Sequence, residues 1–271
     1  MAEIYKVDAS FDHGFFKGTS CAFGVFDGVH RGHRYLLDCA RSTAAETGGA
    51  SVALTFDIDP DEVFHQRGSR SSRRQACACS RTAASASSRC CRSPAISPPR
   101  LEEFLVQTFD GTVPSFLRGL RLQFGARAAS VRDLGSWAAV GTSVQAHDLK
   151  SDDGAPITAT RIRLLLAGGD VEEANRLLGR PYFMTGVVEP GRGRSRYGLR
   201  TANLVVPDQM RPLGGGVRRL CARHGVLSRR ERGVAATFAD RATATCEVHL
   251  LDLGDLYGKP VKVEFLHWLR L

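Results

Sequence analysis

A strand–helix–strand pattern near the N-terminus constrains the fold of this 271-residue chain more than any other feature. Residues 20–26 are an apolar run that stops at a D-G pair, which predicts a strand followed by a turn. Residues 32–46 carry apolar side chains on one helical face and precede a G-G pair, and residues 51–56 predict a second strand. Strands joined in this way run parallel, so the pattern predicts an α/β domain with a doubly wound sheet.

The pattern changes after a G-R-P turn at residues 179–181. Before it we expect helices at 101–108, 158–167 and 171–178 and a strand at 143–147, and Asp170 with Glu173 forms a capping box. After it we expect alternating strands at 182–189, 202–206, 245–251 and 260–269. The predicted fold class is therefore α/β followed by all-β, with domains at residues 1–178 and 179–271.

Residues 66–100 do not fit either pattern. Ser, Arg, Ala and Cys make up 27 of the 35 residues, eight of them Arg, and Ile96 is the only large aliphatic side chain. Such a segment buries too little apolar surface to offset the entropy of ordering it. We expect irregular coil or isolated helix outside the packed core, with few contacts to Phe26, Leu54 or Leu165. We interpret it as degenerate or translated out of frame, and a disordered regulatory loop is the alternative.

The net charge of +9 comes from two stretches, residues 66–100 with +8 and residues 218–232 with +5, and the rest of the chain carries −4. Neither stretch interleaves aromatic side chains for base stacking, which argues against a nucleic-acid partner. No apolar run reaches the ~20 residues of a membrane span, and residues 1–16 lack the apolar core of a signal peptide. The cysteine spacings C-x-C and C-C do not predict a metal site. We expect a cytoplasmic protein.

The sequence G-V-F-D-G-V-H-R-G-H at residues 24–33 lies between the first strand and the first helix. Phosphate binds well at such a place, because helix N-terminal N–H groups meet glycines that permit close approach. His30 and His33 could both face one anion and stabilise charge on a transferring phosphoryl group. The alternative is that they cap the helix or bind a metal ion.

These ten residues resemble the prokaryotic bifunctional riboflavin kinase/FAD synthetase family, a branch of the nucleotidylyltransferases, whose motif is G-x-F-D-G-V-H-x-G-H. A second match is I-T-A-T-R-I-R at residues 157–163, which is similar to the family's I-S-S-T-R-I-R phosphate motif, although a capped basic helix explains it equally well. The resemblance implies a Rossmann-like domain that adenylylates FMN, with His30 and His33 catalytic. It implies an ATP site made of Gly24, Phe26, Asp27, Gly28, His30, His33, Thr160 and Arg161.

The second half resembles the riboflavin kinase module, a small β-barrel. G-R-G-R at residues 191–194 resembles its glycine-rich flap, and G-L-R-T-A-N at residues 198–203 resembles its G-F-P-T-A-N motif. The resemblance implies that Gly191, Gly193, Thr201 and Asn203 bind ATP, that Thr201 and Asn203 hold Mg²⁺, and that Glu247 is the general base. Each feature also has a simpler interpretation. G-R-G-R can be a solvated turn, T-A-N can be the start of a strand, and Glu247 can be an exposed residue of a strand.

The chain departs from the family in four places. T-F-D-I-D-P at residues 55–60 replaces T-F-x-P-H-P, and R-G-L-R-L-Q-F-G at residues 118–125 keeps only the final F-G of the family's strand. The Arg-rich residues 218–232 are expected to replace a strand, and the family continues beyond Leu271 into a C-terminal helix.

We therefore expect an enzyme that makes FMN and FAD from riboflavin and ATP with Mg²⁺, acting on small molecules, with weak homo-oligomerisation left open. The first alternative is a degenerate family member that binds ATP but lacks one or both activities. The second is a basic nucleic-acid-binding protein.

Overall fold

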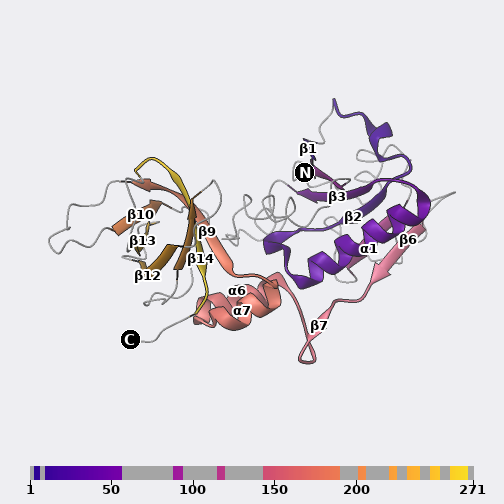
Figure 1. Cartoon of the computed structure of the whole chain (residues 1–271). Coiled ribbons are helices and arrows are strands. Elements are labelled where there is room, and N and C mark those ends of the chain that lie inside the picture. The colour runs from indigo at the N-terminus through magenta and orange to yellow at the C-terminus, as the bar shows by residue number, and fades with distance from the viewer. Residues whose placement is uncertain are drawn as a thin grey trace, which may run out of the picture. The chain divides into compact units, whose positions relative to one another are not determined.

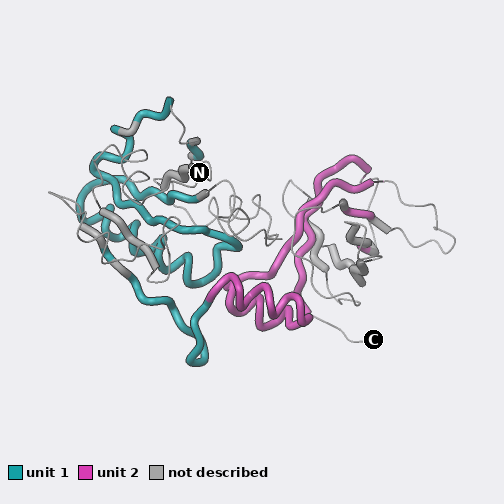
Figure 2. The backbone as a smooth tube through the Cα atoms, turned by 180° about the vertical axis from the view of Figure 1, so that it is seen from behind, with its two compact units in different colours: residues 1–69, 73–157 teal, residues 70–72, 158–271 magenta. Residues whose placement is uncertain are grey.

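The computed structural model of the chain is shown with its elements labelled in Figure 1. It describes residues 3–6, 10–56, 88–93, 115–119, 143–189, 201–205, 220–224, 231–238, 245–250 and 257–267. The chain forms two compact units (Figure 2). Unit 1 comprises residues 1–69 and 73–157, and unit 2 comprises residues 70–72 and 158–271.

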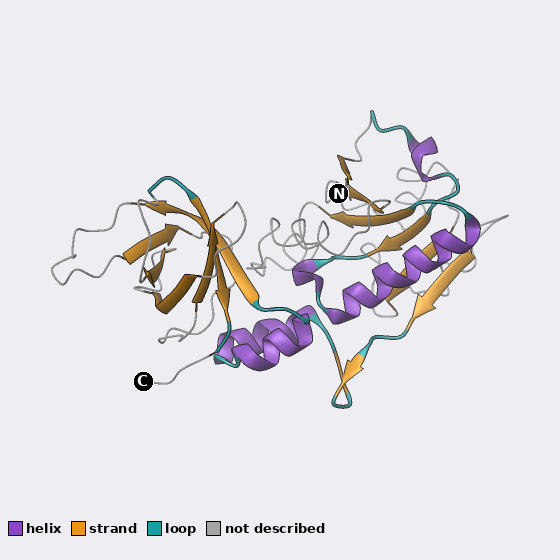
Figure 3. Cartoon of the chain, in the orientation of Figure 1, coloured by secondary structure: helices purple, strands orange, loops and turns teal. Residues whose placement is uncertain are grey.

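A six-stranded sheet forms the centre of unit 1 (Figure 3). Its strands, in spatial order, are β1 (Glu3–Lys6), β4 (Ser88–Ser93), β3 (Ser51–Phe56), β2 (Ser20–Phe23), β5 (Ser115–Gly119) and β6 (Ser143–His147). Every described pair of neighbours is parallel. The chain runs from β2 to β3 and β4 on one side and later to β5 and β6 on the other. The sheet is thus doubly wound, as the sequence predicts.

Helix α1 (Arg31–Thr47) packs on β2, β3 and β5. Leu36, Ala40 and Ala44 recur every fourth residue and are buried, which is the spacing of one helical face. All four residues of β2 are buried, as expected for a parallel strand that is covered on both faces. The helix ends at Gly48, whose φ of 70° is the left-handed conformation that a C-cap favours.

Part of the Arg-rich segment 66–100 belongs to the sheet, which corrects the expectation of irregular coil outside the core. Strand β4 lies between β1 and β3, and its Cys90 and Cys91 pair with Ala53 and Leu54. The prediction weighed side-chain composition, whereas a strand needs backbone N–H and C=O groups, which every residue except proline supplies. Residues 66–87 and 94–100 lie outside the described residues, as does the helix predicted at 101–108.

A short hairpin connects the sheet of unit 1 to the residues that follow. Its strands are β7 (Ser151–Asp152) and β8 (Ala155–Pro156), and the backbone N–H of Ile157 donates to the carbonyl of Lys150 at 2.9 Å. Ile157 is buried at 1% exposure. The hairpin therefore holds the end of unit 1 in a defined conformation.

Two consecutive helices open unit 2, close to the bounds predicted for them, although the sequence pattern places them in the first domain. Helix α6 (Ala159–Gly168) begins after Thr158, and α7 (Val171–Leu178) begins after Asp170. The Asp170 carboxylate accepts the backbone N–H of Glu173 at 3.2 Å, which confirms the N-cap. The capping box is only half formed, because the Glu173 carboxylate binds two arginines and the backbone N–H of Asp170 donates to Leu165.

The strands of unit 2 are β9 (Tyr182–Glu189), β10 (Thr201–Val205), β11 (Leu220–His224), β12 (Glu231–Phe238), β13 (Thr245–Leu250) and β14 (Pro260–Phe265). They pair antiparallel in the order β10-β13-β12-β11-β14-β9, and β9 pairs back to β10. Val188, Leu204 and Val248 are buried on the inner face. Strand β11 and the start of β12 fall within residues 218–232, so the expected loss of a strand there is wrong.

Among the residues that the structure describes, no helix has the length and apolar character needed to cross a membrane.

Candidate active sites

The H-x-G-H loop follows the end of β2, where the strand order of the sheet reverses. Strand β2 has β3 on one side and β5 on the other, and the chain reaches those two neighbours by opposite directions of winding. Ligands of doubly wound sheets bind in the crevice at the carboxyl ends of the strands at this reversal. The topology therefore places the motif where a nucleotide is expected.

A tight turn carries the chain from β2 to the helix. The backbone N–H of Gly24 donates to the carbonyl of Leu54 at 3.2 Å, and Phe26, Asp27 and Val29 are buried. Val29 has a φ of 39°, which is strained for a β-branched residue. Such strain is retained where surrounding packing fixes the conformation, and here it sets the path of the loop into α1.

The two histidines form a stacked pair at the start of α1. Their ring centroids are 3.6 Å apart with an interplanar angle of 18°, and the rings of Phe26 and His33 are edge-to-face with centroids 5.3 Å apart. His30 is the N-cap residue of α1, and its Nδ1 accepts the backbone N–H of His33 at 3.2 Å. The prediction that these histidines cap the helix is thus correct for His30, and it is compatible with an anion site at the same helix end.

Burial makes both imidazoles poor bases. It lowers the pKa of His30 from 6.5 to about 4. The pKa of His33 is lowered well below 6.5 by burial first and by the neighbouring His30 second, and a hydrogen bond with the Asp27 backbone opposes this shift. Both rings are therefore neutral near pH 7, and each carries a single N–H. The N–H of His30 is on Nε2, because its Nδ1 is an acceptor, and it can be donated to a phosphate oxygen. The N–H of His33 is donated to the Asp27 backbone and reaches a phosphate only when that bond is exchanged. Among the described residues, no group of three or more His, Cys, Asp or Glu side chains is arranged to hold a metal ion.

The lowered pKa of His30 predicts that acid destabilises unit 1. Between pH 6.5 and about 4 the unfolded chain takes up a proton that folded His30 does not, so the free energy of unfolding falls as the pH falls. The full loss for this residue is about 3 kcal/mol. In His30→Asn, which cannot titrate but still caps a helix, the protection factors of the α1 amides, which are corrected for the intrinsic pH dependence of hydrogen exchange, should fall less between about pH 7 and about pH 5. The exposed His267→Gln should behave like the parent, and an equal fall in protection in the parent and in His30→Asn would contradict the assignment.

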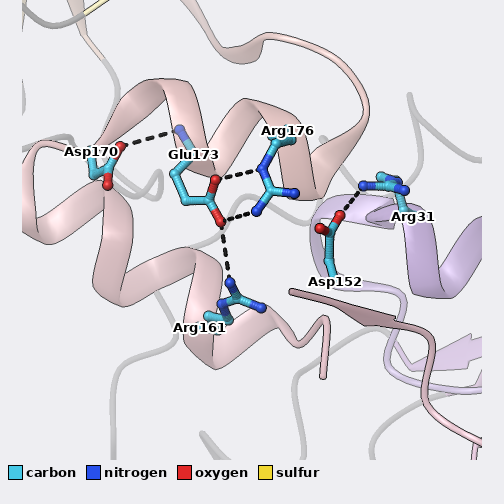
Figure 4. A network of polar contacts seen from close by, with 6 residues as sticks. All are labelled: Arg31, Asp152, Arg161, Asp170, Glu173 and Arg176. Atoms are coloured by element: carbon cyan, nitrogen blue, oxygen red, sulfur yellow. Dashed lines mark hydrogen bonds and ion pairs between the residues drawn. The ribbon is translucent and has the colours of Figure 1, made fainter. Parts of the chain in front are cut away.

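The lack of a side chain at Gly32 leaves room for the His30 ring and the Ile157 backbone to pack against the start of α1. A Cβ atom at this position would lie 3.1 Å from Nδ1 of His30 and 3.5 Å from the carbonyl oxygen of Ile157. The hairpin β7–β8 also reaches this helix end through an ion pair between Arg31 and Asp152 (Figure 4). Sequence reasoning missed this pair, because the partners are 121 residues apart and no local pattern links them.

Replacing Gly32 with alanine should reduce adenylyl transfer rather than stabilise the helix. Glycine to alanine in a helix normally stabilises by ~0.5–1 kcal/mol. Here the His30 ring would have to move, but it is buried and stacked on His33, so we expect no gain in stability and a loss of about tenfold or more in rate. Gly168→Ala is the matched control, because a Cβ there meets no atom within 4 Å. A Gly32→Ala variant as active as Gly168→Ala would contradict this account.

Thr160 and Arg161 lie in the first turn of α6, which belongs to unit 2. Thr158, which was not predicted as a site residue, caps this helix, and its Oγ1 accepts the backbone N–H of Arg161 at 3.1 Å. Thr160 is exposed. The Arg161 guanidinium donates from Nη2 to Glu173 Oε1 at 3.2 Å (Figure 4). The second motif is thus the capped start of a helix. This is what both a phosphate-binding motif and an ordinary capped basic helix require.

The predicted kinase residues occupy adjoining strands of unit 2. Asn203 of β10 is directly opposite Glu247 of β13, and Thr201 is opposite His249. Residues directly opposite one another have Cβ atoms about 5 Å apart, so the register brings the predicted positions together. Gly191 and Gly193 lie outside the described residues.

Comparison with known proteins agrees with the two-part organisation. The family model for FAD synthetase matches residues 13–76, and the family model for riboflavin kinase matches residues 178–271. A bifunctional riboflavin kinase/FMN adenylyltransferase of Pseudomonas fluorescens is 32% identical over 94% of this chain and 85% of its own length. One of Listeria monocytogenes is 27% identical over 92% and 83%.

A solved structure described as a macrolide-efflux protein from Streptococcus pneumoniae superposes with a TM-score of 0.80. It covers 100% of this chain and 91% of the other at 22% identity, which supports a common fold alone. The two family models together indicate a nucleotidylyltransferase joined to a riboflavin kinase module. The chain belongs to the bifunctional riboflavin kinase/FMN adenylyltransferase family.

Proposed function

We propose that this chain phosphorylates riboflavin to FMN and adenylylates FMN to FAD, using ATP in both reactions. The observation that carries the proposal is that separate family models, for FAD synthetase and for riboflavin kinase, match residues 13–76 and residues 178–271 of one chain. We propose residues 1–178 as the adenylyltransferase domain and residues 179–271 as a small riboflavin-kinase β-barrel. The riboflavin kinase match from residue 178 and the closed strand order support this division.

In the adenylyltransferase domain, the FMN phosphate attacks the α-phosphorus of ATP, and the bond to the β-phosphate breaks to release pyrophosphate. His30 donates a hydrogen bond to the phosphates as negative charge moves onto the leaving group, and His33 does the same by exchanging its bond to the Asp27 backbone for one to a phosphate oxygen. The glycines and Phe26–Asp27 of the loop shape the ATP site, and Thr160 and Arg161 of the second motif bind ATP phosphates. Their support is the loop at the switch point of the sheet, the stacked neutral pair and the matching second motif.

In the kinase domain, Glu247 takes the proton of the ribityl 5′-hydroxyl, whose oxygen attacks the γ-phosphorus of ATP and displaces ADP. Thr201 and Asn203 carry the oxygen atoms that suit Mg²⁺, and the register pairs Asn203 with Glu247 and with Glu189. When bound there, Mg²⁺ would neutralise charge on the ATP phosphates. Gly191 and Gly193 would cover those phosphates.

We also propose that the protein acts in the cytoplasm on small molecules and has no nucleic-acid partner. The excess of positive over negative charge is confined to residues 66–100 and 218–232, and this supports the absence of a nucleic-acid partner.

The test is to incubate the purified chain with riboflavin, ATP and Mg²⁺ and to separate the flavins by chromatography. FMN should form first and FAD second, and a chelator should stop both. Saturable ATP binding without flavin turnover would identify a degenerate family member. Salt-sensitive DNA binding with no ATP binding would favour the nucleic-acid alternative.

A further inference from the structure

Glu173 binds two arginines from two helices (Figure 4). From α7 itself, Arg176 donates Nε to Oε2 at 2.6 Å and Nη2 to Oε1 at 2.7 Å. From α6, Arg161 donates Nη2 to the same Oε1 at 3.2 Å. The side chains of Glu173 and Arg161 are 23% and 27% exposed, so solvent screens this contact less than a surface pair.

The carboxylate of Glu173 is fixed by α7 independently of Arg161. The two parallel bonds from Arg176 set the plane of the carboxylate. The backbone of Glu173 is held as well, because its N–H donates to Asp170 Oδ1 at 3.2 Å. Glu173 also lies in the first turn of α7, where a negative charge is favourable. Arg161 therefore meets an acceptor whose position is already set.

Arg161 needs such an acceptor. It lies in the first turn of α6, where the positive end of the helix dipole disfavours a cation. A carboxylate beside it offsets this cost and restricts a long, flexible side chain. A guanidinium carries five N–H donors, so a carboxylate at one nitrogen is compatible with a phosphate at another.

We propose that Glu173 is a positioning residue for FMN adenylylation. It holds the guanidinium of Arg161 ready for the phosphates of ATP, and Arg176 holds Glu173. The inference rests on the proposed role of Arg161. Preorganisation of a binding group acts chiefly on substrate affinity, so loss of Glu173 raises the KM for ATP more than it lowers kcat.

The experiment measures kcat and the KM for ATP in FAD formation from supplied FMN, using the full-length chain. Glu173→Gln should raise this KM about tenfold, and Glu173→Asp, which keeps the charge, should recover much of the loss. The matched control is Glu172→Gln on the same helix turn, because Glu172 contacts the exposed His267 instead. Arg161→Ala should also raise the KM, and adding Glu173→Gln to it should have no further effect. Riboflavin phosphorylation by each preparation reports whether the chain is folded.

The outcomes separate two failures. If Arg161→Ala raises the KM but Glu173→Gln does not, or raises it equally with and without Arg161, the inference is overturned and the proposed ATP site stands. If Arg161→Ala leaves the KM unchanged, the role of Arg161 and the inference fall together. A Glu173→Asp variant as impaired as Glu173→Gln in a folded chain would also overturn the inference, because the carboxylate charge would then not be what matters.

Discussion

Replacing His30 and His33 together with alanine is expected to abolish pyrophosphate release from ATP and FMN. The two rings are stacked 3.6 Å apart at the N-terminus of α1, where the phosphates of ATP are expected. Removing a single donor that stabilises transition-state charge costs about 10²–10³-fold in rate, so the pair should cost at least about 1,000-fold. Riboflavin phosphorylation should continue, because its predicted residues lie in the other unit.

Loss of the buried His30 also removes a helix cap, so a second variant separates chemistry from folding. His33→Gln keeps the Nδ1 acceptor of His30 and the backbone N–H that it binds. We expect this variant to fold and to lose about 100-fold in adenylyl transfer. The exposed His267→Gln serves as the control, and it should match the parent. A double alanine variant with the parent's rate would show that the assignment is wrong.

Replacing Glu247 with glutamine should abolish FMN formation while leaving FAD formation from supplied FMN intact. The register pairs Glu247 with Asn203 on one side and with Thr237 on the other. A positioned general base contributes about 10²–10⁴-fold, and glutamine cannot accept the proton. The rate of riboflavin phosphorylation should therefore fall by about that factor.

The control for Glu247 is Glu264→Gln in β14 of the same sheet. The Glu264 carboxylate forms an ion pair with the ammonium group of Lys262 at 2.6 Å, and Lys262 is two residues away on the same strand. Partly exposed pairs of this kind contribute little, so we expect full activity. If Glu247→Gln keeps the parent's rate, or if both variants lose activity equally, Glu247 is not the base.

Local patterns predicted the elements that depend on local chemistry. The turn after β2, the helix that ends at Gly48 and the N-cap at Asp170 each follow from neighbouring residues. The H-x-G-H motif was found in the same way, because strand, loop and helix follow one another directly. Its position at the switch point depends on the order of all six strands, which no local pattern contains.

Contacts between distant residues could not be predicted. The Arg31–Asp152 pair and the Arg161–Glu173 pair join residues from different elements, and nothing in either local sequence indicates its partner. Glu173 shows why the capping box was only half right. One backbone N–H competes for its carboxylate with two guanidinium groups, whose charged hydrogen bonds are stronger.

The Arg-rich segments misled sequence reasoning for a different reason. Amino-acid composition indicates how much apolar surface the side chains of a segment can bury. Strands β4 and β11, however, are held by backbone pairing with strands on both sides. The neighbouring strands supply core residues such as Leu54 and Val263, and those strands follow the apolar and alternating patterns from which they were predicted. A strand of unusual composition can thus be accommodated between regular ones.

The fate of labelled ATP tests the central claim most directly. Two parallel reactions with the purified chain, riboflavin and Mg²⁺ would contain ATP carrying radioactive phosphate at either the α or the γ position. The account predicts that the γ label enters FMN and is carried into FAD, whereas the α label enters FAD and never FMN. A γ label that enters no flavin would contradict the kinase, and an α label that enters no flavin would contradict the adenylyltransferase.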